Sequence, residues 1–309
     1  MEYEMVHSHW FAIIFLICIT AFGLISCEIY LRYVGFGSYP IYDIDNDIKY
    51  IPGANQHGRF RNRNFWYFND RHMGNISDWR PERHPNVLLI GDSIVFGGNP
   101  FNHGDKLGPL LEKGLGATTT VWSVAASAWT NVNEMVYLER NPDVLQSADT
   151  VIVEYMSDGL TAANPWPGYY VFPDHKPWLL TSYIFRRNVL VPLLGRISSD
   201  CGSVPATGAT DAAQLQRFKM LISSVSSKRN VVIFMYPMRF ELRDRSGWLE
   251  ATAPVRNLCQ ENTLICIDVA LEPTWGESAY KGDGVHPTVA GNKALASILA
   301  KAVINKSAL

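Results

Sequence analysis

The sequence predicts an α/β protein, a three-layer α/β/α sandwich around a five-stranded parallel sheet, preceded by one transmembrane helix. Three observations support this prediction. Five short runs are apolar throughout, helical segments alternate with these runs, and a long uncharged run lies near the N-terminus. With 309 residues, of which 47% are hydrophobic, the chain is long enough to bury a full core.

Residues 11–33 predict a membrane anchor, which follows an N-terminal flank of residues 1–10. The run carries no charge before Glu28 and is long enough to cross a hydrocarbon layer of about 30 Å. Its edges carry aromatic rings, which favour the membrane interface: Trp10, Tyr30 and Tyr33. In an alternative interpretation, "LISC" is a lipoprotein processing box and Cys27 is lipidated. The first ten residues lack Lys and Arg, so an uncleaved anchor is preferred.

Residues 34–84 are rich in Gly, Asn, Asp and Pro and show no sustained helical or strand periodicity. We expect this segment to wrap the core as loops. Residues 85–309 form the main domain, in which an aromatic and proline-rich insertion at 160–209 interrupts an otherwise regular pattern.

The main domain alternates expected strands with expected helices. The apolar runs lack alternation, as strands do when both faces of a parallel sheet are covered. The connections between such strands are right-handed crossovers, which place helices on both faces. The expected strands are 86–90, 118–124, 150–156, 230–236 and 264–269, and the expected helices are 106–114, 131–140, 211–227, 247–262 and 288–304.

Charge and cysteine usage exclude two classes of function. The 27 Lys and Arg nearly balance the 29 Asp and Glu, without a dense basic block, so we expect no nucleic-acid partner. The five cysteines form no CxxC pair and no His/Cys cluster at zinc spacing, so we expect no metal site. Cys259 and Cys266 could pair in an oxidising compartment, but two buried thiols are the preferred interpretation.

Three residues at the expected strand ends have the chemistry of a nucleophile, a base and an orienting acid. Ser93 follows the first strand of the main domain, while Asp283 and His286 precede the last helix. Ligands bind at the carboxyl ends of parallel strands, so these positions lie at one edge of the sheet. A serine hydroxyl needs an imidazole to take its proton, and the imidazole needs a carboxylate to set its tautomer. Taken alone, "GDS" could be a turn, and Asp-x-x-His could be a helix cap.

Together these motifs resemble those of the SGNH (GDSL) hydrolase family. "GDS" at 91–93 is similar to the first family block, and "DGVHPTVAGN" at 283–292 is similar to the last. The resemblance covers about 85–304, and it implies a flavodoxin-like sheet, no cofactor, and ester hydrolysis or acyl transfer. "EIYLRYVGFG" and "YIPGANQHGRF" look like the membrane-anchored members of bacterial surface-polysaccharide systems.

The middle blocks depart from the family pattern. The family's Asn and Gly after the second strand are replaced by "WSVAASAW", so Ala125 or Ala126 would supply a backbone N–H to the oxyanion hole, together with that of Ser93. The family's Asn after the third strand is replaced by Ser157 or Asp158. A serine hydroxyl can donate to an oxyanion whereas an ionised aspartate would repel it. We therefore assign Ser157 as the donor and Asp158 as a loop-ordering residue or substrate contact.

The aromatic insertion could overhang the site and contact sugars, because flat aromatic rings suit the apolar faces of a glycan. Alternatively, its rings pack the loop down or lie on the membrane beside the anchor. The rings assigned to substrate binding are Trp166, Tyr169, Tyr170 and Trp178.

The sequence thus predicts a single-pass membrane serine esterase or O-acyltransferase that acts on ester-linked acyl groups, preferentially O-acetyl groups, of a cell-surface polysaccharide. Arg32 alone would favour a cytoplasmic domain. The family resemblance instead implies the periplasmic or extracellular side, with polysaccharide-assembly proteins as partners. Two alternatives stay open: a lipase or thioesterase with the same triad, and an inactive scaffold that binds glycan in an assembly complex.

Overall fold

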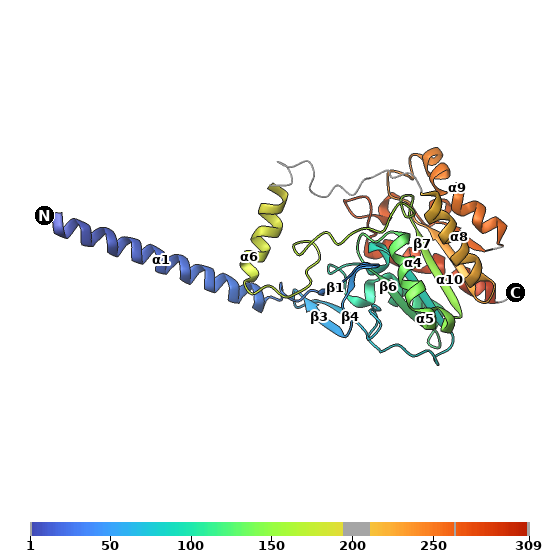
Figure 1. Cartoon of the computed structure of the whole chain (residues 1–309), viewed down its shortest axis with the longest axis horizontal. Helices are drawn as coiled ribbons and strands as arrows, with labels where there is room; N and C mark the ends of the chain where they lie inside the picture. Colours follow the sequence, from blue (N-terminus) through green and yellow to red (C-terminus); the bar gives the residue numbers. More distant parts are fainter. Residues whose placement is uncertain (1, 194–210, 263, 308–309) are drawn as a thin grey trace.

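The computed structural model of the chain describes residues 2–193, 211–262 and 264–307. A long helix, α1 (Glu2–Tyr33), projects from the folded body (Figure 1). Its Trp10–Tyr33 part is unburied, and it is the one helix in the described part of the chain that is long and apolar enough to cross a membrane. A signal sequence near the N-terminus has the same features, so α1 is a candidate for either role. Cys27 is exposed on this helix with a free thiol, and its lipidation stays a prediction.

A five-stranded parallel sheet forms the centre of the main domain, as predicted. The strands are β5 (Asn86–Gly91), β6 (Thr120–Ala125), β7 (Thr150–Tyr155), β8 (Asn230–Met235) and β9 (Ile265–Asp268). They pair in the order β6-β5-β7-β8-β9, and each neighbouring pair is parallel. Because the chain runs outward from β5 in both directions, the sheet has the flavodoxin-like order, with a switch point beside β5 where ligands bind.

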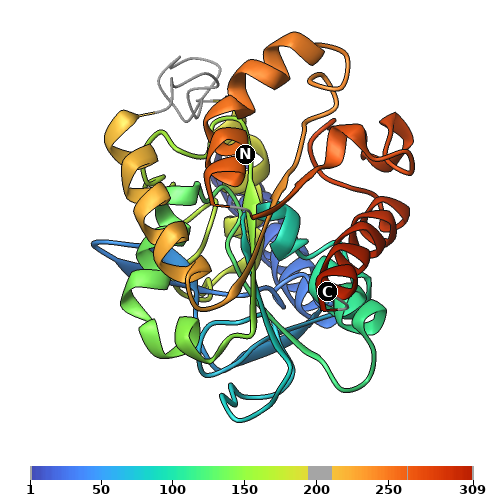
Figure 2. The ribbon, with the colours of Figure 1, turned by 90° about the vertical axis from the view of Figure 1, so that its right-hand side faces the viewer.

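Helices cover both faces of this sheet (Figure 2). One face packs against α4, α5, α8 and α9, while the other packs against α3 and α10. Neighbouring strand residues point to opposite cores, as Leu88 and Leu89 do, and both side chains are fully buried. The bounds of the helices are α3 (Leu107–Leu115), α4 (Asn131–Arg140), α5 (Pro142–Ser147), α8 (Ala212–Ser226), α9 (Arg245–Glu261) and α10 (Val289–Ser307).

The helices begin where their sequences supply capping groups. Asp211 caps α8 by accepting hydrogen bonds from the N–H groups of Ala213 and Gln214. Thr130 and Asn133 form a capping box at the start of α4. These side chains satisfy N–H groups that have no partner within the helix. The five expected helices of the main domain are confirmed, with ends shifted by up to three residues.

The expectation that residues 34–84 form loops throughout is wrong for residues 42–68. Two antiparallel hairpins occur there, β1 (Tyr42–Asp45) with β2 (Lys49–Pro52), and β3 (Gln56–Phe60) with β4 (Asn64–Phe68). Strands of four or five residues are too short to show a clear period in sequence. A hairpin is marginal on its own and needs packing partners. Here the Tyr50 hydroxyl donates to the backbone oxygen of Ser127 at 2.8 Å, which ties the first hairpin to the loop after β6.

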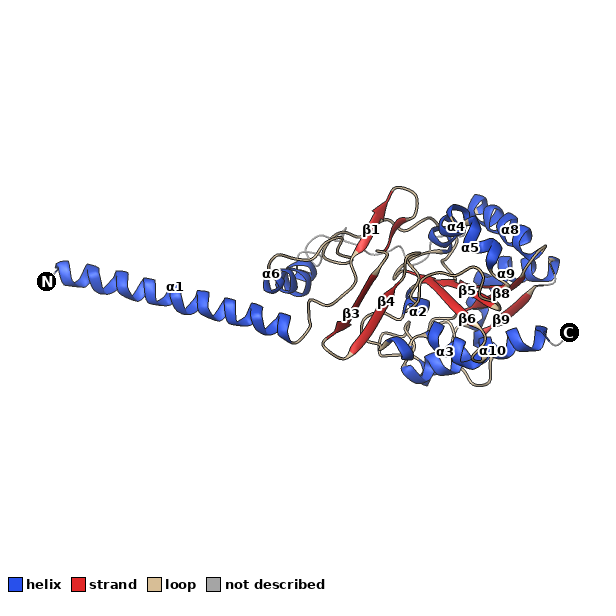
Figure 3. Cartoon of the chain, turned by 90° about the horizontal axis from the view of Figure 1, so that it is seen from below, coloured by secondary structure: helices blue, strands red, loops and turns tan. Residues whose placement is uncertain are grey.

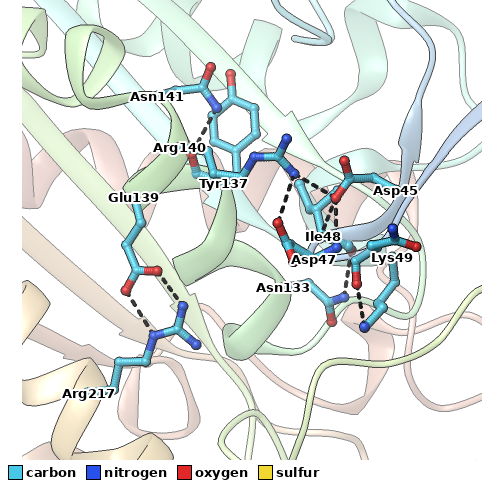
Figure 4. Close-up of polar contacts among 11 residues, drawn as sticks. Asp45, Asp47, Ile48, Lys49, Asn133, Tyr137, Glu139, Arg140, Asn141 and Arg217 are labelled. Atoms are coloured by element: carbon cyan, nitrogen blue, oxygen red, sulfur yellow. Dashed lines mark hydrogen bonds and ion pairs between the residues drawn. The ribbon is translucent and has the colours of Figure 1, made fainter.

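Polar contacts fasten the first hairpin to α4 (Figure 4). Arg140 on α4 donates to Asp45 Oδ1 at 2.6 Å, and Asn133 Nδ2 donates to the backbone oxygen of Ile48 at 3.0 Å. On the other side of the same helix, Glu139 pairs with Arg217 of α8. The segment before the main domain is therefore built into its surface.

The carboxyl edge of the sheet faces the hairpins. Helix α2 (Ser93–Phe96) follows β5 and lies between the sheet and the second hairpin (Figure 3). Phe96 stacks on Phe68 of β4 with ring centroids 5.9 Å apart, and Asn64 Nδ2 donates to the backbone oxygen of Pro100 at 2.9 Å. In Figure 3 the hairpins lie between this edge and α1. Whatever binds at this edge therefore lies on the side of the domain that faces the apolar helix.

A short helix in the insertion holds the end of α1. The Glu28 carboxylate accepts hydrogen bonds from the N–H groups of Leu180 and Thr181, at 2.9 and 2.8 Å, at the start of α6 (Leu180–Phe185). Residues 194–209 of the predicted insertion lie outside the described residues. The remaining helical turns are η1 (His103–Asp105), η2 (Arg186–Leu190), η3 (Val269–Leu271) and η4 (Glu277–Ala279).

Cys259 and Cys266 form a disulfide, so the preferred interpretation of two buried thiols is wrong. Cys259 lies in the last turns of α9 and Cys266 lies in β9. The return of the chain from helix to sheet brings their Cα atoms to 6.1 Å, within the range that a disulfide spans. The spacing of the two cysteines in the sequence does not show that the fold brings them together.

Candidate active site

Ser93 is presented at the carboxyl edge of the sheet by a tight strand-to-helix turn. Gly91 ends β5, Asp92 caps α2 by accepting a hydrogen bond from the Ile94 N–H at 2.8 Å, and Ser93 is the first residue of the helix. A Cβ atom on Gly91 would lie 2.2 Å from Glu154 Oε2. Only glycine fits at this position, because the neighbouring strand carries a buried glutamate.

The structure brings together the three residues predicted to act on an ester. His286 Nε2 lies 3.1 Å from Ser93 Oγ, and His286 Nδ1 lies 3.0 Å from Asp283 Oδ2. Both distances are within hydrogen-bond range, so the hydroxyl, the imidazole and the carboxylate form a continuous chain. Ser93 is separated from His286 by 193 positions. The fold therefore makes the constellation that a nucleophile, its base and an orienting acid require.

The loop that carries the base is ordered by its own backbone. Asp283 Oδ1 accepts hydrogen bonds from the N–H groups of Val285 and His286, both at 2.9 Å. Partial burial opposes ionisation of Asp283, but these hydrogen bonds and the His286 side chain outweigh it and lower its pKa. Gly284 has a φ of 73° in the same turn, a conformation that side chains with a Cβ rarely adopt. Asp283 therefore stays ionised at neutral pH, as an orienting acid must.

The predicted oxyanion-hole residues are Ser93, Ala125, Ala126 and Ser157. Ser93 begins α2, so its N–H has no partner within the helix. Ala125 pairs in register with Gly91, which places Ala125 and Ala126 beside the turn that carries the nucleophile. Ser157 follows β7, and its side chain hydrogen-bonds to Glu241. The Ser157 hydroxyl would have to leave this partner to donate to an oxyanion, and the roles of all four residues stay predictions.

The aromatic insertion contacts the protein itself. Trp166 packs on the core and donates its indole N–H to the backbone oxygen of Phe172 at 2.8 Å. Tyr169 and Tyr170 pack around Tyr183 of α6. Trp178 is 88% exposed, and its backbone oxygen accepts from Arg32 at the end of α1. These contacts match the alternative in which the rings pack the loop down or lie beside the anchor, and sugar contact by any of the four stays a prediction.

Sequence reasoning missed a group of buried acids behind Ser93. Asp92, Glu134 and Glu154 are 9%, 3% and 1% exposed. Burial raises the pKa of Asp92 to about 6, and burial together with mutual repulsion raises the pKa of Glu134 and Glu154 well above their ordinary values. The Asp92 N–H donates to Glu154 Oε2 at 2.9 Å, and repulsion from the Asp92 carboxylate adds to the effect of burial on the pKa of Glu154. A signal was present, because a charged residue inside the apolar run "TVIVEYM" is unusual in a buried strand.

The buried acids line a cavity of about 330 Å³. The cavity also contacts Asp158, which follows β7 as predicted, and Val285, next to the base. In the described part of the chain no group of three or more His, Cys, Asp or Glu side chains is arranged to hold a metal ion. The cavity is therefore lined by Asp92 and Val285, the chain neighbours of Ser93 and His286.

A second hollow of about 420 Å³ lies between α2, the hairpins and the insertion. Seven of its seventeen lining residues are aromatic, and its walls extend from Phe96, on the helix of the nucleophile, to Phe36, which follows α1. Ser127 lines this hollow whereas its neighbour Ala128 lines the acidic cavity. The loop after β6 therefore separates an aromatic hollow from an acidic one.

Comparison with solved structures finds matches over most of the chain. TesA covers 71% of this chain and 97% of its own, at 15% identity and a TM-score of 0.44. A carbohydrate acetylesterase family member from Sinorhizobium meliloti covers 72% of this chain and 99% of its own, at 16% identity and a TM-score of 0.40. The esterase EstA from Pseudoalteromonas sp. covers 73% of this chain and 100% of its own, at 10% identity and a TM-score of 0.43. Two further matches carry SGNH and G-D-S-L in their descriptions.

The chain resembles the SGNH (GDSL) hydrolases. No protein-family model matches the sequence, and no curated protein matches it. The likeness to SGNH structures is weak in identity and in TM-score, so the chemistry of this site is judged from its own atoms.

Proposed function

We propose that this protein is a serine esterase or O-acyltransferase in which Ser93 is the nucleophile, His286 the base and Asp283 its orienting acid. The observation that carries the proposal is the continuous hydrogen-bonded chain from Ser93 through His286 to Asp283, with distances of 3.1 and 3.0 Å. A chain of this kind can activate a hydroxyl for attack on an acyl carbon.

In the proposed reaction, the Ser93 hydroxyl gives its proton to His286 Nε2 while its oxygen bonds to the ester carbonyl carbon. The backbone N–H groups of Ser93 and of Ala125 or Ala126 stabilise the oxyanion. His286 then returns the proton to the departing alcohol, which leaves an acyl group on Ser93. Water or a sugar hydroxyl, deprotonated by the same imidazole, then attacks the acyl carbon. The bond between this carbon and Ser93 Oγ breaks, and His286 returns the proton to Ser93.

We further propose that the substrate is an ester on a cell-surface polysaccharide, with O-acetyl as the preferred acyl group. The site edge faces the apolar helix α1, so a membrane-held protein would present Ser93 toward material at the membrane surface. The Cys259–Cys266 disulfide supports a domain in an oxidising compartment, which favours the periplasmic or extracellular side over the cytoplasm. Assembly proteins of the same polysaccharide are the proposed partners.

One observation favours a second candidate function. The aromatic hollow of about 420 Å³ reaches from the nucleophile's helix toward α1, and an apolar hollow of this size suits a long acyl chain. A lipase or thioesterase would use it. Comparison of p-nitrophenyl acetate with p-nitrophenyl decanoate separates the two functions, because a chain-binding enzyme prefers the longer ester and an acetylesterase the shorter one.

Labelling with a fluorophosphonate probe tests the nucleophile. The full-length protein in detergent should be labelled, and Ser93→Ala and His286→Ala should each lose labelling. Ser224→Ala, at an exposed position on α8, is the matched serine control and should keep label, because Ser93 alone forms the bond to phosphorus.

A folded wild-type protein that takes no label would contradict the proposal. Binding of acetylated glycan by that unlabelled protein would instead support the scaffold alternative. Folding of each variant is checked by its urea unfolding curve.

A further inference from the structure

The acidic cavity beside Ser93 has an unusual charge distribution. Four acidic side chains line it, those of Asp92, Glu134, Glu154 and Asp158. None of the described lining residues is Lys, Arg or His. Three of the four are buried, and a buried carboxylate costs free energy unless a proton or a cation neutralises it. The acidic lining therefore indicates a positively charged ligand.

The buried acids lack compensation within the protein. In the described part of the chain, none of Asp92, Glu134 and Glu154 forms an ion pair with Lys or Arg. Glu134 receives one hydrogen bond, from Asn131 Nδ2 at 2.8 Å, and Glu154 Oε2 receives one from the Asp92 N–H at 2.9 Å. Glu154 Oε1 is buried and receives none from an N–H or O–H group of the described residues. Glu154 thus keeps one buried oxygen that no donor among the described residues satisfies.

The remaining walls suit a cation with an apolar outer shell. Trp129 is 3% exposed, and its indole N–H is held by the backbone oxygen of Tyr50 at 2.8 Å. Met156 and Met238 also line the cavity. Aromatic faces and thioethers attract organic ammonium groups, which carry positive charge on a largely apolar surface.

We propose that this cavity binds an ammonium group on the alcohol part of the ester substrate. The proposal rests on the proposed function, because it places this group next to the acyl carbon that Ser93 attacks. It defines the substrate class as esters of cationic alcohols, and it excludes esters whose alcohol part carries a carboxylate or phosphate here. An amino sugar with a free amine and a choline-type head group both have this chemistry.

Isothermal titration calorimetry on the full-length protein in detergent tests the proposal with two matched ligand pairs. Choline and 3,3-dimethyl-1-butanol have the same shape but differ in charge. Glucosamine and N-acetylglucosamine differ in whether the amine is charged. We expect the charged member of at least one pair to bind about tenfold more tightly or better, in line with desolvated cation recognition. Preference within the choline pair indicates a head group, and preference within the glucosamine pair indicates an amino sugar.

Two variants locate the binding. Glu134→Gln keeps the shape of the side chain and an acceptor for Asn131, and Asp158→Asn changes an acid that is only half-buried, so we expect both variants to fold. Each should reduce the charge preference at least threefold, whereas Glu82→Gln on an exposed loop should leave it unchanged. Equal binding within both pairs, no binding of any of the four ligands, or a preference unaffected by both cavity variants would overturn the proposal.

Failure of the inference is distinguishable from failure of the proposed function. Fluorophosphonate labelling of Ser93 without any charge preference overturns the ammonium site and leaves the esterase standing. Charge-selective binding without labelling supports the ammonium site and contradicts the esterase.

Discussion

Carboxyl groups occur near Ser93 in two regions with opposite environments. In the loop Asp283–His286, side chains of the acid and the base are 47% and 38% exposed, and backbone N–H groups hold the carboxylate. Behind the nucleophile, Asp92, Glu134 and Glu154 are buried against each other. The pKa of Asp283 is lowered, whereas the pKa values of the three buried acids are raised. The environment therefore keeps Asp283 ionised and favours the neutral form of the buried acids, and we propose different roles for the two: orientation of the base for Asp283, and binding of a cation for the buried acids.

The largest expected effect comes from the exposed region. Asp283→Asn should lower kcat for p-nitrophenyl acetate about 10³- to 10⁴-fold, because an amide no longer favours the required tautomer of His286 or stabilises its cation. The matched control is Asp174→Asn, which removes the acid of another exposed Asp–His pair, with His175 at 2.7 Å, and should keep full activity. A fully active Asp283→Asn enzyme would show that His286 acts without its acid.

A smaller effect is expected for a substitution at Gly91, which lies between the buried Glu154 and the turn that carries Ser93. In Gly91→Ala the new Cβ would lie 2.2 Å from Glu154 Oε2, so the strand or the glutamate must move. Overpacking of this kind should lower the free energy of unfolding by about 2–3 kcal/mol, measured in urea. Gly104→Ala is the control, since nothing lies within 4 Å of a Cβ at that position. An unchanged midpoint for Gly91→Ala would mean that Glu154 does not occupy this place.

Removal of one acid from the buried region should stabilise the protein at neutral pH. Burial raises the pKa of Glu134 in the folded state, so the folded state binds its proton up to a higher pH than the unfolded state does. The unfolding free energy of the wild type should therefore fall as the pH rises above the ordinary glutamate value. Glu134→Gln has no titrating group at this position. It should therefore be more stable than the wild type by about 1–2 kcal/mol at pH 7, with no gain near pH 4. Urea unfolding at both pH values measures the difference, and an equal gain at both would contradict the assignment.

The smallest effect is expected for an exposed carboxylate far from the site. The hydrogen bond from Arg140 lowers the pKa of Asp45 to about 2, with backbone N–H groups of Ile48 and Asp47 contributing. This stabilisation is present above the ordinary aspartate pKa and is lost as the pH falls through the folded value. Because the pair is open to solvent, Asp45→Asn should cost only about 0.5 kcal/mol at pH 7 and less in 0.5 M salt. A loss above about 2 kcal/mol would mean that the first hairpin holds the domain together.

Much of the main domain was predictable because its elements carry strong local signals. Uninterrupted apolar runs such as "NVLLIG" have few uses other than a covered strand, and Asp211 or Thr130 caps its helix from within the local sequence. The features that the sequence did not predict depend on contacts between distant residues. Hairpin β1–β2 is held by α4 and by the loop after β6, and the Cys259–Cys266 bond depends on how α9 returns to the sheet.

The sequence by itself determined the parallel sheet, its covering helices and the apolar N-terminal helix. It also identified Ser93, Asp283 and His286 as the residues that meet at the sheet edge. These follow from composition, periodicity and the chemistry of side chains after strand ends, all of which are local. Tertiary structure alone decided that Asp92, Glu134 and Glu154 share one cavity wall and that the insertion packs on α6 and α1. The reason is physical: the burial of an acid, and hence its pKa and its use, depends on which distant residues exclude water from it.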